Sequence, residues 1–259
     1  MPVWPATRQR LAAMLLAVVL IFCPFHPAAA QDSYTTFLEG YTGLLRDYLR
    51  PVAGPVAYQG VDYNAWRNDM RHERALVSLL RSVPPEGGDA AKAYWLNAYN
   101  FLIIDLIVMT GEEDSIQNLG TFFHGPWTGY EWSFGAKDIS LARIERDILK
   151  PMQDARISFA MACGAVSCPD LREQPFLAAD MDAQLDDQVR HMLADAGKGL
   201  RLDDDGRGVH VTRIMTWDKK DFGSRDAWLR RYRADLPEDM ILKFMPYDWS
   251  LNDVPMPAM

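Results

Sequence analysis

Apolar residues recur at helical spacing in three stretches of the chain. Over 34–49 they fall three and four positions apart, and Pro51 ends the pattern. A second amphipathic stretch covers 64–82, where Asn64 can act as the N-cap, and a third, more polar one covers 179–196. The pattern predicts three helices, each with one apolar face packed against a core.

The stretch 92–109 is apolar on all sides, which is typical of a helix buried at the centre of a domain. Gly111 ends it, and Asn97, Asn100 and Asp105 interrupt it. These polar residues argue against a membrane span, because each would need a hydrogen-bond partner. Asn97 and Asn100 lie three positions apart and share a face, so they either tie the helix to neighbouring loop backbone or line a site.

Short alternating segments predict a small β component. Residues 199–202 and 209–211 flank a turn rich in Asp and Gly, which indicates an antiparallel hairpin. Further helices are expected at 141–149, 224–234 and 237–244. We therefore predict an α+β fold: a mainly helical single domain with a central buried helix and a small antiparallel β component, the hairpin near 199–212.

The first thirty residues differ from the rest. Arg8 and Arg10 precede an apolar run over 11–22, and small residues lead up to Ala30. This pattern predicts a secretory signal peptide cleaved after Ala30, since a retained anchor would need ~20 apolar residues. We expect an exported protein, periplasmic or extracellular, with no stable membrane span after cleavage.

Charge narrows the range of partners. The 259 residues carry a formal net charge of −8, which becomes more negative once Arg8 and Arg10 leave with the signal peptide. Such an acidic chain has no general field that attracts nucleic acid or anionic lipid. We expect no nucleic-acid partner, and the sequence names no protein partner.

Two cysteines of the expected mature chain stand close together, at Cys163 and Cys168, with Ser167 and Pro169 beside the second. Their spacing is neither that of a Cys-x-x-Cys redox motif nor that of a zinc-binding pair, so we expect no metal and no cofactor. In an oxidising compartment they can form a disulfide. Alternatively, Cys163 is a free nucleophile at the rim of a cleft.

A nucleophilic Cys163 would need a base, and His124 is the candidate because it lies in an aromatic loop shaped by a Gly-Pro pair. Asn97 would then orient the substrate or stabilise an oxyanion. Arg156 would either anchor an acidic group or pair with Glu145 as an internal clamp. His124 can also be a loop histidine that stacks on aromatic rings without a catalytic role.

The other histidines are expected at the surface. His72 and His191 lie in polar helical stretches and should be solvated, and His210 should lie on the outer face of the hairpin.

Five segments occur in an order that resembles the family known as domain of unknown function 547. They are Tyr94–Asn100, Ser140–Glu145, Ala155–Ala160, Cys163–Pro169 and the tryptophan-led Asp221-Phe222. Tyr247–Asn252 also fits the closing segment of the family. The resemblance covers about 89–252. Together with the N-terminal pattern, it divides the chain into a signal peptide at 1–30, an N-terminal helical region at 31–88, the family-like core at 89–252 and a tail at 253–259.

The resemblance implies that a set of polar residues belongs to the family pattern: Asn97, Asn100, Glu145, Arg156, Cys163 and Cys168. It implies no activity. Two positions depart from the pattern, since this chain has Arg146 and Ser158 where the family commonly has histidine. If either histidine were the family's general base, this protein would lack it, and His124 would have to replace it.

We therefore expect an exported protein with a polar cleft around Cys163 and Cys168 that binds a small polar or peptide-like ligand. Its binding residues would be Asn97, Asn100, Arg156 and Ser167. The alternative is a hydrolase or transferase with Cys163, His124 and Glu145 as catalytic residues, and a thiol–disulfide exchanger is a weaker third hypothesis. Each hypothesis requires the cysteine segment to pack against the central helix.

Overall fold

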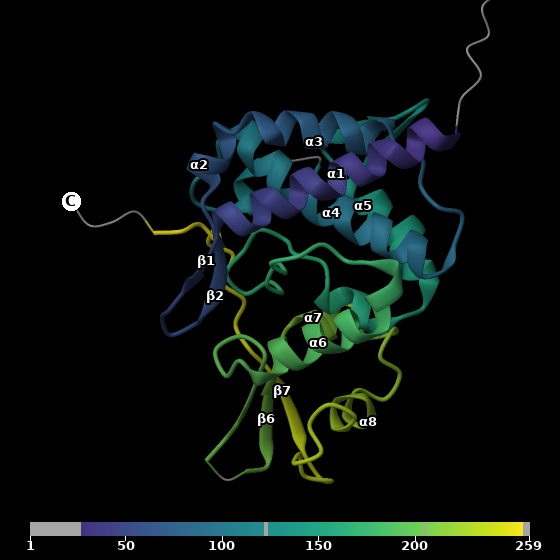
Figure 1. Cartoon of the computed structure of the whole chain (residues 1–259). Coiled ribbons are helices and arrows are strands. Elements are labelled where there is room, and N and C mark those ends of the chain that lie inside the picture. Colours follow the sequence, from purple (N-terminus) through teal and green to yellow (C-terminus); the bar gives the residue numbers. More distant parts are fainter. Residues whose placement is uncertain (1–26, 122–123, 205, 256–259) are drawn as a thin grey trace, which may run out of the picture.

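The computed structural model of the chain describes residues 27–121, 124–204 and 206–255 (Figure 1). Residues 1–26 of the predicted signal peptide lie outside this part. The described chain has a mixed α+β fold, as predicted, built around helix α4 (Gly88–Thr110).

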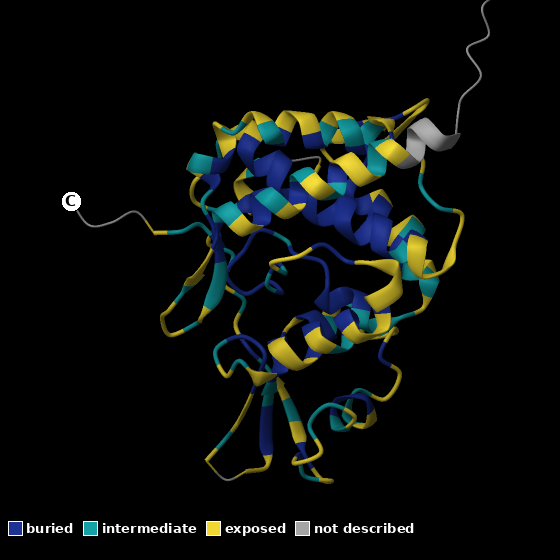
Figure 2. Ribbon diagram, viewed as in Figure 1, coloured by how far each residue is buried: buried dark blue, intermediate teal, exposed yellow. Residues whose placement is uncertain are grey.

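Helix α4 is the buried centre of the fold. Nearly every residue from Ala91 to Val108 is buried, and Gly111 ends the helix in the left-handed conformation at φ 73° (Figure 2). Within the described ranges α4 alone is long and apolar enough to cross a membrane, but 89% of its apolar stretch is buried inside the protein. Its apolar surface on all sides is explained by packing within the protein.

Helices α1 (Pro27–Tyr48) and α3 (Met70–Arg81) run side by side and cover one face of α4 (Figure 1). Edge-to-face contacts between aromatic rings connect α1 to α4. The centroids of Phe37 and Tyr41 on α1 lie 5.3 and 5.4 Å from that of Phe101 on α4. The predicted helix at 34–49 is confirmed, and its apolar positions form this contact.

The predicted helix at 64–82 is in fact two helices, α2 (Tyr63–Arg67) and α3. The Asp62 side chain accepts a hydrogen bond from the backbone of Ala65 and caps α2, so Asn64 is not the cap. Asp69 accepts one from Arg71 N and caps α3. The second cap breaks the helix because an Asp side chain satisfies the free N–H groups of a new first turn.

A second hydrophobic core lies beyond α6 (Met181–Ala194), which confirms the helix predicted at 179–196. Met181 and Leu185 face the core around α4, whereas Val189, Met192 and Leu193 face the second core. The second core is completed by α7 (Ile214–Trp217), α8 (Arg225–Arg230), β5 (Leu200–Leu202), β6 (Gly208–Val211) and β7 (Ile241–Phe244). Helix α6 thus connects the two cores.

The hairpin predicted at 199–212 is confirmed as β5 and β6, which pair antiparallel with Leu200 opposite Val211. The helix predicted at 237–244 is wrong. Its second half is the strand β7, which pairs parallel with β6 and places Phe244 opposite Val211. The backbone of β6 has a free edge there, and pairing with a neighbouring segment overrides weak helical spacing.

Shorter elements connect these parts. Two further hairpins are β1 (Leu49–Val52) with β2 (Tyr58–Val61), and β3 (Glu131–Phe134) with β4 (Lys137–Ser140). The helix predicted at 141–149 begins as α5 (Leu141–Arg143) and continues as a π-helical turn, Ile144–Leu149. Turns of 3-10 helix lie at Ile116–Leu119, Lys150–Met152, Ala155–Phe159 and Ala178–Asp180.

Candidate functional site

The cysteine segment packs against α4, which confirms the expected contact. The side-chain amide of Asn100 donates to the carbonyl of Ala160 and accepts from the amide of Ala162, both at 2.9 Å. At Gly164, where φ is 78°, a Cβ atom would stand 2.7 Å from Cδ1 of Ile107. Glycine alone suits both this backbone conformation and this close approach to the helix.

The C-terminal segment, residues 247–252, packs against the cysteine segment, residues 163–169, on the side away from α4. The backbone of Ser167 donates to the carbonyl of Asp248 at 3.2 Å, and Ser167 Oγ accepts from Asp248 N at 2.9 Å. Asn252 N donates to the carbonyl of Gly164 at 3.1 Å. Ser167 is buried and already bonded, so its hydroxyl holds the chain together rather than facing a ligand.

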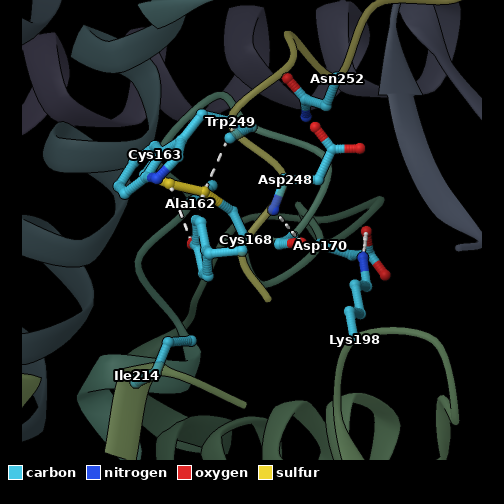
Figure 3. Close-up of a disulfide and its surroundings, with 12 residues drawn as sticks. Ala162, Cys163, Cys168, Asp170, Lys198, Ile214, Asp248, Trp249 and Asn252 are labelled. Carbon is cyan, nitrogen blue, oxygen red and sulfur yellow. Dashed lines mark hydrogen bonds and ion pairs between the residues drawn. A yellow bond between two sulfur atoms is a disulfide. The ribbon is translucent and has the colours of Figure 1, made fainter. Parts of the chain in front are cut away.

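Cys163 and Cys168 lie at disulfide distance, with 5.7 Å between their Cα atoms (Figure 3). This Cα separation is typical of a bridge. The hydroxyl of Tyr247 lies 3.3 Å from the sulfur of Cys163 and 3.2 Å from that of Cys168. Burial raises the pKa of Tyr247 above its ordinary value, so the hydroxyl keeps its proton and donates to the sulfur atoms.

Cys163 borders a cavity of about 240 Å³ that lies between the cysteine segment, α7 and the C-terminal segment. Five of its lining side chains are aromatic: Tyr99, Trp127, Trp217, Tyr247 and Trp249. Trp249 lies beside the bridge in Figure 3. We expected a polar cleft here. The walls are instead mainly apolar, because aromatic side chains that are distant in sequence meet at this cavity.

Two carboxylates, Glu145 and Asp218, also line this cavity. Lys150 pairs with both: its Nζ lies 3.2 Å from Glu145 and forms a short contact with Asp218. The π-helical turn brings Glu145 and Lys150 together, since Lys150 N donates to Glu145 O across five residues. Such π turns are frequent at functional sites. One ammonium group thus serves two carboxylates at the edge of the cavity.

Arg156 does not reach Glu145, so the predicted clamp between them is wrong. The guanidinium binds Asp154 at 2.9 Å, Asp186 at 2.9 Å and Asp182 at 2.8 Å. Asp154 also caps the turn that carries Arg156, and this proximity makes it the preferred carboxylate. With three carboxylates around it, Arg156 joins its own turn to α6 and is occupied within the protein.

Asn97 is buried and serves the backbone rather than the cavity. It accepts from Phe176 N at 2.8 Å, donates to Phe176 O at 2.8 Å and lies 3.1 Å from the hydroxyl of Tyr34. Of the two roles left open for Asn97 and Asn100, the structure supports the first, because both amides tie α4 to neighbouring backbone.

Replacing Asn97 with leucine should lower the free energy of unfolding by about 2–4 kcal/mol, because the N–H and C=O of Phe176 would lose their partner in the interior. Urea denaturation followed by circular dichroism measures this change. The control Asn64→Leu alters an exposed asparagine on α2 and should stay within about 0.5 kcal/mol. Equal midpoints for Asn97→Leu and the unmodified chain would contradict the role of the amide.

Two histidines differ from expectation. His124 is exposed, and its backbone pairs with Thr121; it is not among the residues that line the cavity beside Cys163. His72, predicted to be solvated, is buried: Trp66 Nε1 donates to its Nδ1 at 2.8 Å, and its Nε2 lies 2.7 Å from Asp105. The helix that carries His72 is polar overall, but the histidine lies on its inner face.

Asp170, two residues after Cys168, has several bonded partners. Lys198, whose side chain is fully buried, lies 2.6 Å from one carboxylate oxygen (Figure 3). Gln59 N donates to the same oxygen at 2.8 Å. His191 Nε2 lies 3.1 Å from the other oxygen. Burial by itself would raise the pKa of Asp170, but these bonds outweigh it and hold the pKa below its usual value.

The bond to Asp170 raises the pKa of His191 above its ordinary value. The stabilising effect of His191 should therefore be complete below about pH 6.5 and be lost as the pH rises through the raised pKa. Asp170 has the opposite pH dependence: its stabilising effect on the folded protein is complete above about pH 4 and is lost as the pH falls. Solvent screens the largely exposed His191, so its part should stay below about 1 kcal/mol.

Thermal unfolding of the unmodified chain and of His191→Gln at pH 5.5 and 8.5 measures this effect. We expect the difference in melting temperature between the two proteins to be larger at pH 5.5. A difference that is the same at both pH values would show that the protonated histidine does not contribute.

Sequence reasoning missed the aromatic walls and Asp218. Tyr247 and Trp249 fall within a segment that the family resemblance includes, and Trp217 stands just before Asp218. Their residue types were visible, but nothing in their spacing places them around one cavity. In the described part of the chain, no group of three His, Cys, Asp or Glu side chains is arranged to hold a metal ion.

Comparison with known proteins supports the resemblance at the level of a region. Residues 87–193 match the family described as "Protein of unknown function, DUF547". This region contains α4, the π-helical turn with Glu145, and both cysteines. No curated protein and no solved structure matches the chain.

Proposed function

We propose that this chain, with its DUF547 region at 87–193, binds a small ligand in the aromatic cavity beside the Cys163–Cys168 bridge, and that it does so as an exported protein. The observation that carries the proposal is the convergence of aromatic side chains on a cavity that the bridge borders. Trp217 supports it further, because it is 51% exposed although its ring belongs to the aromatic cluster. Ligand pockets are lined mainly by hydrophobic and aromatic side chains, and Trp217 adds an accessible ring to this lining.

The size of the cavity limits the ligand. About 240 Å³ lies just below the ~300–1,000 Å³ that is usual for pockets of drug-sized ligands. A small metabolite, or one side chain or headgroup of a larger molecule, fits this volume. The proposal therefore favours a compact chemical group over an extended peptide.

The bridge supports binding over nucleophilic catalysis. A cysteine nucleophile must be a thiolate, and a sulfur held in a disulfide cannot become one without reduction. The thiol also lacks the expected base, since His124 does not line the cavity. An oxidised pair instead stiffens the loop that forms one wall, and closing so short a loop adds about 2 kcal/mol of stability.

Nuclear magnetic resonance of the indole N–H groups tests the proposal. The oxidised protein, labelled with ¹⁵N, is titrated with indole, phenol and choline as small probes, and the tryptophan signals are assigned from single Trp→Phe variants. We expect at least one probe to shift the indole signals of Trp217 and Trp249. The signal of Trp66, which is buried and bonded to His72, should stay in place.

Matched variants complete the test. Trp217→Ala should weaken binding of the active probe, whereas Met109→Ala, an exposed apolar residue outside the cavity lining, should leave it unchanged. If no probe shifts the signals of Trp217 and Trp249, the proposed function is wrong. If a probe shifts Trp66 to the same extent, binding is not confined to the cavity and the proposal also fails.

A further inference from the structure

We propose that the group bound in this cavity is an organic cation, an alkylated ammonium such as a choline-like headgroup. This inference rests on the proposed function and specifies its ligand class. Two observations carry it: the inclined aromatic rings of the walls, and the excess of negative charge among the groups at the cavity's edge.

The aromatic rings form angled walls rather than a parallel stack. The centroid of Tyr247 lies 4.8 Å from that of Trp217 and 4.5 Å from that of Trp249, with the ring planes inclined by 65° and 49°. Trp217 and Trp249 are 5.7 Å apart and inclined by 33°. Trp127 adds a fourth ring, 6.0 Å from Trp249 at 66°. Because these rings contact one another, a guest would lie on the side of the ring cluster that borders the cavity, against the ring faces that remain open there.

Aromatic faces attract cations, and tryptophan does so most strongly. A quaternary or alkylated ammonium is weakly hydrated for its charge and presents methyl groups, so it satisfies apolar walls and the ring quadrupoles together. The three tryptophans of this cavity therefore favour such a guest over a hard, strongly hydrated ion.

The negative charge at the edge of the cavity also favours a cationic guest. Glu145 and Asp218 are both lining residues, and Lys150 is the cation bonded to them, so this cluster keeps one net negative charge. A cationic guest would neutralise that charge, whereas an anion would be repelled. The acidic chain as a whole, at −8, adds a field of the same sign that attracts cations.

The bridge supports this geometry by holding one wall in place. The hydroxyl of Tyr247 donates to the sulfur atoms, which fixes the orientation of its ring relative to Trp217 and Trp249. A wall held in this way costs less ordering entropy when a guest enters.

Comparing choline with 3,3-dimethyl-1-butanol isolates the charge, because the alcohol has the same shape with carbon in place of the ammonium nitrogen. Isothermal titration calorimetry with the oxidised protein measures both. We expect choline to bind about tenfold more tightly. Raising the sodium chloride concentration from 50 to 500 mM should weaken the binding of choline and leave the binding of the alcohol unchanged.

Variants assign the effect to particular residues. Glu145→Gln should weaken choline severalfold without changing the binding of the alcohol, whereas Glu39→Gln on α1, away from the cavity, should change neither. Trp217→Phe should weaken the binding of choline less than Trp217→Ala does, because phenylalanine still offers an aromatic face, although a smaller one.

The outcomes separate the two proposals. If the alcohol binds as tightly as choline, the cation inference is overturned and the proposed function stands. If neutral N-acetylglucosamine binds and choline does not, the inference is overturned in favour of a sugar. If none of these probes, nor indole or phenol, binds at the cavity, the proposed function itself fails.

Discussion

Replacing Lys198 with methionine is expected to lower the free energy of unfolding by about 3–5 kcal/mol, the usual cost of removing one partner of a buried ion pair. The Lys198 side chain is fully buried, and its Nζ lies 2.6 Å from Asp170. Methionine has a similar length and fills the same space, so the loss should come from the carboxylate left behind. Urea denaturation at pH 7 measures it.

The double variant Lys198→Met with Asp170→Asn tests this cause. An asparagine at 170 removes the uncompensated charge and still offers a carbonyl oxygen to Gln59 N, which donates to Asp170 in the unmodified protein. We expect the double variant to be more stable than Lys198→Met alone. If the double variant lost as much free energy of unfolding as the two single variants lose together, the methionine would disrupt packing instead.

Replacing Asp105 with leucine should lower the free energy of unfolding by about 4 kcal/mol. Asp105 is buried on α4, with its oxygens 2.7 Å from His72 Nε2 and 2.7 Å from Trp132 Nε1. Trp66 Nε1 can only donate, so Nδ1 of His72 accepts and the ring proton lies on Nε2, toward Asp105. Leucine would leave two buried donors without partners, at about 1–3 kcal/mol each.

Trp132→Phe serves as the matched comparison, because it removes one donor and leaves the bond to His72 in place. We expect it to cost less than half as much as Asp105→Leu, measured by the same denaturation series. If Asp105→Leu proved no less stable than Trp132→Phe, the network would contribute little and the central carboxylate would need another explanation.

The fold was predictable where the apolar pattern is long and dense. The 92–109 pattern identified α4, and Gly111 marked its end, because a helix buried on all sides leaves no ambiguity of face. Weaker patterns were less informative: the segment 64–82 shows helical spacing throughout, but the Asp69 cap divides it into two helices. The segment 237–244 became a strand because β6 offers a free edge, which is a contact distant in sequence.

The candidate site was predictable only in part. The cysteine pair was visible from its spacing, but the sequence left a bridge and a nucleophile as open alternatives. Asn97 and Asn100 were identified as buried polar residues that need partners, and the structure supplies backbone partners for both. Of the two roles left open for Arg156, the pair with Glu145 is wrong, since the guanidinium binds the carboxylates that the fold brings nearest.

The sequence by itself determined the class of fold, the buried central helix and the pair of sulfurs, because these depend on composition, periodicity and neighbours along the chain. The tertiary structure alone decided that Trp217, Tyr247 and Trp249 line the same cavity as Cys163, and that Lys198 is buried against Asp170. These contacts join residues tens of positions apart. Local physics cannot specify them, because which aromatic faces meet depends on how the C-terminal segment returns across the cysteine loop.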